Sequence, residues 1–116
     1  DTHFSLSHTA GAAAAALADM PVGVDIERVR PVSVRAMERI AGVRTEAAFF
    51  RSWVRREARV KRTGSGIVTM MRTEAPLNRG EFYYEVDSFH GYAAGVAAGQ
   101  PEPPQPVRRL MLDQLL

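Results

Sequence analysis

Along the chain, hydrophobic and polar residues alternate with a period of two in some segments and recur with a helical period in others. Residues 4–8 alternate large side chains with serines, and residues 22–27 alternate apolar residues with acids, so both segments predict strands. Residues 12–18 are almost all alanine, which favours a helix by propensity. The turn signal Asp-Met-Pro at 19–21 favours a hairpin instead, and we therefore expect a strand here.

One long helix dominates the middle of the chain. It is expected over residues 45–62, with Thr45 as its N-cap and Gly64 at its end. Strands around one principal helix make an α+β domain, here a small antiparallel sheet packed on the long helix plus a short helix. The other expected elements are the short helix at 32–40, a strand at 67–73, and a hairpin of strands at 82–86 and 92–98.

The domain organisation follows from composition. One domain is expected over residues 1–99, because the whole chain has only 116 residues. Residues 100–106 are proline-rich and predict an extended linker. Residues 107–116 predict a short amphipathic tail that packs on this domain or on a neighbour.

The long helix carries an unusual lysine. Of the 15 basic side chains, 14 are arginine, and Lys61 is the one exception. On a helical wheel, Glu57 and Lys61 fall within the apolar arc, beside Phe50 and Val54. A simple i,i+4 ion pair would suit a solvated face, whereas charges on a core face are costly unless they are paired or bound to something. The wheel therefore favours a functional site. The helix arginines, Arg51, Arg55, Arg56, Arg59 and Arg62, are expected on the solvated face.

Two carboxylates lie on the strand at 22–27. Asp25 and Glu27 project from the same side, opposite Val24 and Ile26, which point into the core. Paired carboxylates are the hard oxygen ligands that Mg²⁺ accepts, and Glu57 could supply a third. The alternative is a polar strand edge that faces water.

The motifs together resemble one known family. In order, they are Phe-Ser-Leu-Ser-His at 4–8, Gly-Val-Asp-Ile-Glu at 23–27, Trp-x-x-Arg-Glu-Ala-x-x-Lys at 53–61, Gly-x-Gly at 64–66 and the final hairpin. This series, over residues 3–98, resembles the 4'-phosphopantetheinyl transferases of the Sfp type. The resemblance implies a holo-carrier-protein synthase that moves the phosphopantetheine arm of coenzyme A onto a serine of a carrier protein and releases adenosine 3',5'-bisphosphate.

The resemblance also implies a role for each site residue. Asp25, Glu27 and Glu57 would hold Mg²⁺ against the pyrophosphate, and Glu57 would take the proton of the carrier serine, directly or through a metal-bound water. Lys61 would contact the phosphate under attack or the leaving oxygen. The remaining residues implied to contact coenzyme A are Ser7 and His8, by its phosphates, and Gly64 and Gly66, by their backbone.

The chain departs from the family pattern in several places. Arg56 replaces a lysine, Ser5 stands where asparagine is common, and the stretch between Glu27 and Trp53 is short. An Sfp-type enzyme has two similar halves and is about twice as long, so we expect a fragment. The missing N-terminal half, or a partner in a homo-oligomer, would then complete the site.

Composition limits the other possibilities. A net charge of +2 is too small for a dedicated nucleic-acid binder, and an apolar run at 10–18 is too short to span a bilayer. We therefore expect neither nucleic acid nor membrane as a partner. The absence of cysteine is consistent with a cytoplasmic protein. Two alternatives stay open, namely a non-catalytic interaction domain with the same fold and a small basic nucleic-acid-binding domain.

Overall fold

The computed structural model describes residues 1–101, 103 and 104, and shows the α+β domain that the sequence predicts. The predicted tail at 107–116 lies outside the described residues, and so does part of the predicted linker. In chain order the elements are β1 (His3–Thr9), β2 (Ala12–Ala18), β3 (Gly23–Arg28), α1 (Val34–Ala41), α2 (Glu46–Thr63), α3 (Ile67–Arg72), β4 (Phe82–Val86) and β5 (Tyr92–Ala98).

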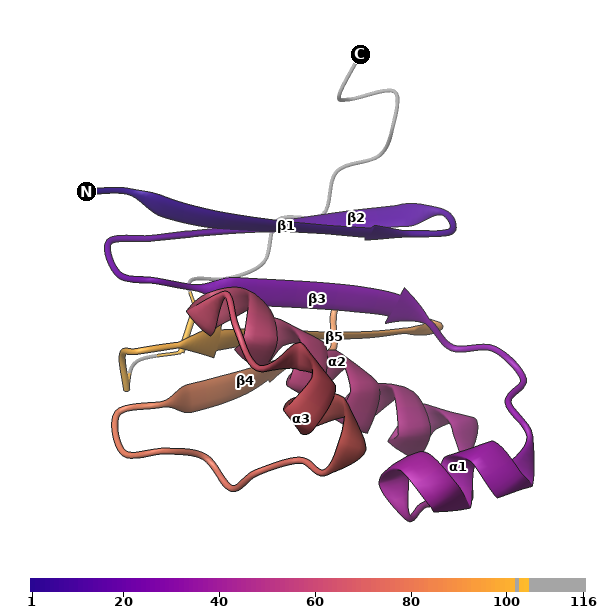
Figure 1. Ribbon diagram of the computed structural model, residues 1–116. Helices are drawn as coiled ribbons and strands as arrows, with labels where there is room; N and C mark the ends of the chain where they lie inside the picture. Colours follow the sequence, from indigo (N-terminus) through magenta and orange to yellow (C-terminus); the bar gives the residue numbers. More distant parts are fainter. Residues whose placement is uncertain (102, 105–116) are drawn as a thin grey trace.

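The strands form two antiparallel sheets. β1 and β2 pair as a hairpin, and β3, β5 and β4 form a second sheet with β5 in the centre. In Figure 1 the β1–β2 hairpin lies on the side of β3 that is opposite β5, and α2 runs against the three-stranded sheet. None of the helices in the described part of the chain is long and apolar enough to cross a membrane.

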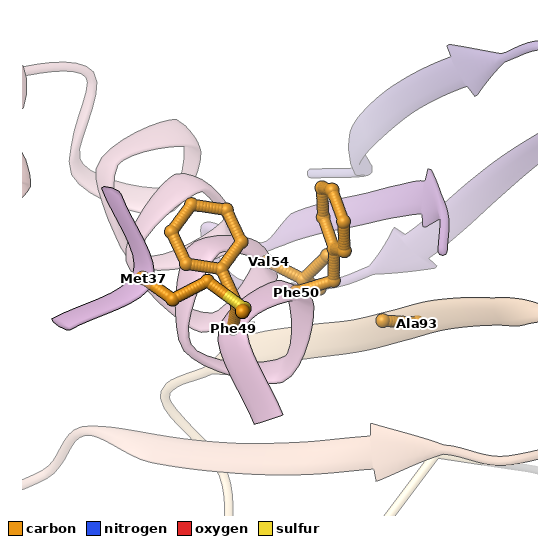
Figure 2. Packing of buried hydrophobic residues seen from close by; sticks show 5 residues of the cluster. All are labelled: Met37, Phe49, Phe50, Val54 and Ala93. Carbon is orange, nitrogen blue, oxygen red and sulfur yellow. The ribbon is translucent and has the colours of Figure 1, made fainter. Parts of the chain in front are cut away.

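Two hydrophobic clusters hold these layers together. The larger one joins α1, α2 and β5 through buried side chains, which Figure 2 shows. The smaller one places Val24 of β3 and Val96 of β5 against Ala14, Ala16 and Ala18 of β2. Alanines allow the hairpin to approach the sheet closely, so packing outweighs their helical propensity and the predicted strand is confirmed. The hairpin predicted across residues 19–21 is wrong, because β2 pairs with β1 and β3 pairs with β5. The members of the larger cluster are Met37, Phe49, Phe50, Val54 and Ala93.

Capping residues set the ends of the two longer helices. Thr45 accepts a hydrogen bond from the amide of Ala48, and Gly64 ends α2 with a φ of 77°, so the prediction for this helix is confirmed. Helix α1 begins two residues later than predicted, because the Ser33 side chain accepts a hydrogen bond from the amide of Ala36 and caps the helix there.

The strand predicted at 67–73 is wrong. Residues Ile67–Arg72 form the short helix α3, which begins directly after Gly66 with a φ of 85°. Ile67 and Val68 are exposed, so their branched side chains have no sheet face to pack on. A short helix satisfies the local backbone instead, because the amide of Met70 donates a hydrogen bond to the carbonyl of Gly66 at 2.9 Å.

The predicted solvated position of the helix arginines is wrong for two of them. Arg56 is 5% exposed and Arg59 is 2% exposed. Arg56 donates to the carbonyls of Ile40 and Met71. Arg59 forms a bidentate ion pair with Glu81, at 2.8 and 2.9 Å. The helical wheel treats guanidinium groups as polar, and it cannot show that a later segment folds back to cover them.

The Arg59–Glu81 pair fixes the segment between α3 and β4. Arg59 also donates to the carbonyls of Ala75 and Pro76, and Glu81 accepts from the amide of Asn78. Burial raises the pKa of Glu81, but the hydrogen bonds from Arg59 and Asn78 outweigh burial and bring the pKa below the ordinary value of 4.5. The charged form of Glu81 therefore stabilises the fold.

Strand β3 and helix α2 touch at a glycine. A Cβ atom at Gly23 would lie 2.0 Å from the carbonyl oxygen of Ala58 and 2.5 Å from the amide nitrogen of Arg62. Both atoms belong to the helix backbone, which cannot move aside as a flexible side chain can. Glycine at this position therefore sets the distance between β3 and α2.

We expect Glu81→Ala to lower the free energy of unfolding by about 3 kcal/mol at pH 7, because it removes the bidentate partner of the buried Arg59 guanidinium. Glu74, at 3.5 Å, is then the carboxylate that remains beside Arg59. Since the folded-state pKa of Glu81 is lowered, this contribution is fully present above pH 4.5 and is lost as the pH falls through the folded-state value. Urea unfolding at several pH values measures it. Glu85→Ala removes the same charge from an exposed position of β4, and an equal loss there would contradict the prediction.

We expect Gly23→Ala to lower the free energy of unfolding by about 3 kcal/mol, because the new methyl group must push α2 away from β3. Gly99→Ala is the matched control. Its methyl group would meet the end of the flexible Arg62 side chain at 2.9 Å, which can move. Urea unfolding measures the free energy of unfolding of both variants, and equal stability of the two would disprove the steric argument.

Candidate active site

One pocket lies where β1, β3 and α2 meet. It is a cavity of about 350 Å³, and its lining includes six of the eight residues that the sequence predicts for the site. Gly64 and Gly66, which the structure also describes, lie in the turn after α2 and are not part of this lining. The lining residues are Leu6, Ser7, His8, Asp25, Glu27, Trp53, Glu57 and Lys61.

The backbone geometry of β3 and α2 directs the charged side chains into the pocket. Asp25 and Glu27 are two residues apart on β3, so both point to the face that α2 covers. Glu57 and Lys61 are four residues apart on α2, so both point to the same side of the helix. The helix crosses β3 beside Gly23, which brings the two pairs together.

Asp25 is the centre of the hydrogen bonding in the pocket. Its Oδ1 atom accepts from the Nζ of Lys61 at 3.0 Å and from the hydroxyl of Ser7 at 2.9 Å. Asp25 is only 6% exposed, and its Oδ2 atom is buried without a hydrogen-bond partner among the described residues. Lys61 also donates to the backbone carbonyl of Leu6, at 3.3 Å. Lys61 thus pairs across to β3 and β1 and makes no simple i,i+4 pair with Glu57.

Negative charge is in excess in the pocket. Burial raises the pKa of Asp25, and the nearby charge of Glu27 adds to this, although Lys61 and Ser7 oppose it. Burial also raises the pKa of Glu57, and the charge of Asp25 raises it further. Three carboxylates and one ammonium line the pocket. Lys61 pairs with Asp25, and Glu27 pairs with Arg30 at 3.5 Å. A cation in the pocket would relieve this repulsion.

The residues fit a cation that is shared with a ligand. Among residues 1–101, 103 and 104, no group of three or more acidic or histidine side chains is arranged to hold a metal ion by itself. The buried Oδ2 of Asp25 nevertheless has no hydrogen-bond donor among the described residues. A buried acceptor without a donor is costly unless a ligand binds to it. Mg²⁺ commonly uses one or two carboxylates together with waters and substrate phosphates. The donor set agrees with that mode of binding.

Three features of the site were not predicted from the sequence. Leu6 contributes its backbone carbonyl, which has no sequence signal. Trp53 lines the pocket and also packs against the larger hydrophobic cluster. The contact between Ser7 and Asp25 was also missed. The alternation in residues 4–8 could have indicated it, because it puts both serines on the face of β1 opposite Phe4 and Leu6.

Comparison with known proteins identifies relatives with a common name. The chain is 38% identical over 77 residues to the 4'-phosphopantetheinyl transferase psf-1 of Bacillus pumilus, covering 56% of this chain and 33% of the relative. It is 26% identical to the 4'-phosphopantetheinyl transferase Sfp and 24% identical to the 4'-phosphopantetheinyl transferase ffp, both of Bacillus subtilis. Those two alignments cover the whole chain and 63% of each relative. No protein-family model matches the chain.

The chain that forms this fold and this pocket is thus related in sequence to a class of enzymes, the 4'-phosphopantetheinyl transferases. The resemblance to the Sfp type, which the order of the motifs predicts, is confirmed. The chain spans less than two thirds of the length of each of these relatives.

We expect Asp25 and Lys61 to be energetically coupled. In a double-mutant cycle with Asp25→Asn and Lys61→Met, the coupling energy should be about 1–3 kcal/mol, because Asp25 is buried and each substitution leaves the other group incompletely paired. Urea unfolding of the four proteins measures it. The Glu38–Arg44 pair is the control, since its side chains are 45% and 82% exposed and its coupling should be below about 1 kcal/mol. Similar coupling in both pairs would contradict the expectation.

Proposed function

We propose that the protein transfers the 4'-phosphopantetheine arm of coenzyme A to a serine of an acyl or peptidyl carrier protein. The observation that supports this most strongly is the convergence of Asp25, Glu27, Glu57 and Lys61 on one pocket. These residues come from two motifs whose order resembles that of the Sfp-type transferases. The coenzyme and the carrier protein are the proposed partners, and the cytoplasm is the proposed location.

The reaction exchanges one phosphorus–oxygen bond for another. The carrier serine oxygen forms a bond to the phosphorus that bears the pantetheine arm. The bond from that phosphorus to the bridging oxygen of the pyrophosphate breaks, and adenosine 3',5'-bisphosphate leaves with the electron pair. The proton of the serine goes to the carboxylate of Glu57, which lines the pocket.

Lys61 is the proposed phosphate contact. Its ammonium carries three protons, and the carbonyl of Leu6 and the carboxylate of Asp25 accept two of them. The third N–H can donate a hydrogen bond to a phosphate oxygen of the substrate. Its side chain is 32% exposed, so a ligand can reach it. Neutralisation of charge on the phosphate by this point charge stabilises the transition state.

Mg²⁺ is the proposed metal, and Asp25, Glu27 and Glu57 are the residues that would hold it. When bound, it would neutralise charge on the pyrophosphate. His8 is proposed to contact the coenzyme, because it lines the pocket and is exposed. The backbone of Gly64 and Gly66 is proposed to lie beside the coenzyme, although the pocket lining ends before this turn.

The test is a transfer assay with the protein that carries these residues, coenzyme A, Mg²⁺ and an apo carrier protein. We expect the carrier to gain the mass of the phosphopantetheine arm, measured by intact-protein mass spectrometry. Glu57→Gln should lower the rate by about 10²-fold or more, because the amide cannot accept the serine proton. Glu85→Gln, at an exposed position of β4, is the control and should keep the wild-type rate. Full activity of Glu57→Gln would refute its role as the base.

A further inference from the structure

Three hydroxyl side chains of β1 lie along the edge of β3. Ser5, Ser7 and Thr9 follow one another at every second position of β1. Their oxygens accept hydrogen bonds from the backbone amides of Val24 at 3.0 Å, Ile26 at 3.1 Å and Arg28 at 3.4 Å. Figure 1 shows that this is the edge of β3 opposite β5. Side-chain oxygens here replace the backbone carbonyls of a neighbouring strand.

Ser7 differs from the other two hydroxyls. It alone among them also donates a hydrogen bond to a carboxylate within the described residues, to Oδ1 of Asp25 at 2.9 Å. Ser5 is buried to a similar extent, with 9% exposure against 7% for Ser7, and it makes the same contact with a β3 amide. The structural contribution of the two serines is therefore comparable, and only Ser7 acts on the pocket.

The hydrogen bond from Ser7 fixes the orientation of the Asp25 carboxylate. Oδ1 receives both donors, Ser7 and Lys61, whereas Oδ2 receives none from the described residues. Rotation of the carboxylate would break two hydrogen bonds at once. A serine hydroxyl has one proton to donate, and here Asp25 accepts it, so that proton is not available to a phosphate.

We propose that Ser7 is a positioning residue that holds Asp25 with Oδ1 on Lys61 and keeps Oδ2 free for a divalent cation. This inference rests on the proposed function for the identity of the cation, and it differs from the coenzyme contact that the sequence resemblance implies for Ser7. Without the hydroxyl, the carboxylate turns both oxygens toward Lys61, and the cation loses a preformed ligand.

The test measures Mn²⁺ binding by electron paramagnetic resonance, in the absence and in the presence of coenzyme A. Ser7→Ala should raise the dissociation constant of Mn²⁺ about tenfold, the lower end of the usual effect of such supporting groups. Ser5→Ala removes an equivalent acceptor of a β3 amide and should leave the constant within about twofold of the wild type. Ser7→Thr retains the hydroxyl and should restore binding, since Thr9 already makes the same amide contact on β1.

The outcomes separate this inference from the proposed function. Equal Mn²⁺ affinity of Ser7→Ala and Ser5→Ala, or no recovery in Ser7→Thr, would overturn the positioning role even if the protein transfers phosphopantetheine. The absence of Mn²⁺ binding by the wild-type protein in both conditions would overturn it as well. Mn²⁺ binding that depends on Ser7, in a protein without transfer activity, would support the positioning role and contradict the proposed function. Urea unfolding of both alanine variants checks that they fold equally well.

Discussion

The close approach of α2 to β3 at Gly23 is the constraint on which the pocket depends. The helix backbone occupies the space in which any other residue would place its Cβ atom. Since the helix is fixed at this point, the side chains of Glu57 and Lys61 reach the face of β3 that carries Asp25 and Glu27. Two residues further along the strand, the same approach allows one ammonium to contact both β3 and β1. Glycine in the first position of the motif therefore has a steric reason, and the carboxylates that follow it have an electrostatic one.

The buried charges of the domain are of two kinds. On one side of α2, Arg59 is surrounded by acceptors from Glu81, Ala75 and Pro76, so its charge and its donors are well satisfied. On the other side, Asp25 pairs with Lys61 but keeps one oxygen without a donor from the described residues, and Glu27 and Glu57 line the same pocket. A fully paired arginine stabilises the fold, whereas a buried carboxylate oxygen without a donor, in a pocket with two further carboxylates, is typical of a ligand site. The same helix thus presents a structural face and a functional face.

The sequence predicted those parts of the structure that depend on local signals. The cap residues Thr45 and Gly64 defined α2, and the period of two defined β1 and β3. What failed depended on distant residues. Arg56 and Arg59 were assigned to solvent because their partners come from α1 and from residues 71–81, far along the chain. The strand predicted at 67–73 failed for a related reason, since branched residues form a strand only where a sheet edge is available. Similarly, the side of each strand or helix on which the site residues lie could be predicted from the sequence. The pairing of Lys61 with Asp25 could not, because it depends on how α2 is placed along β3.

The donors in the pocket explain why a lysine stands in a chain otherwise rich in arginine. Lys61 contacts a carbonyl on β1 and a carboxylate on β3, and in the proposed function its third proton is directed to a phosphate. An ammonium can direct its three protons toward acceptors around it, whereas a guanidinium is flat and directs its protons within one plane. Arginine could pair well with Asp25, but its planar group would be poorly placed to donate to Leu6 and to a phosphate at the same time. Ser7 donates its single proton to Asp25, whereas Lys61 keeps one proton that neither Asp25 nor Leu6 accepts. The exception in composition therefore follows from the number and direction of hydrogen bonds that this position requires.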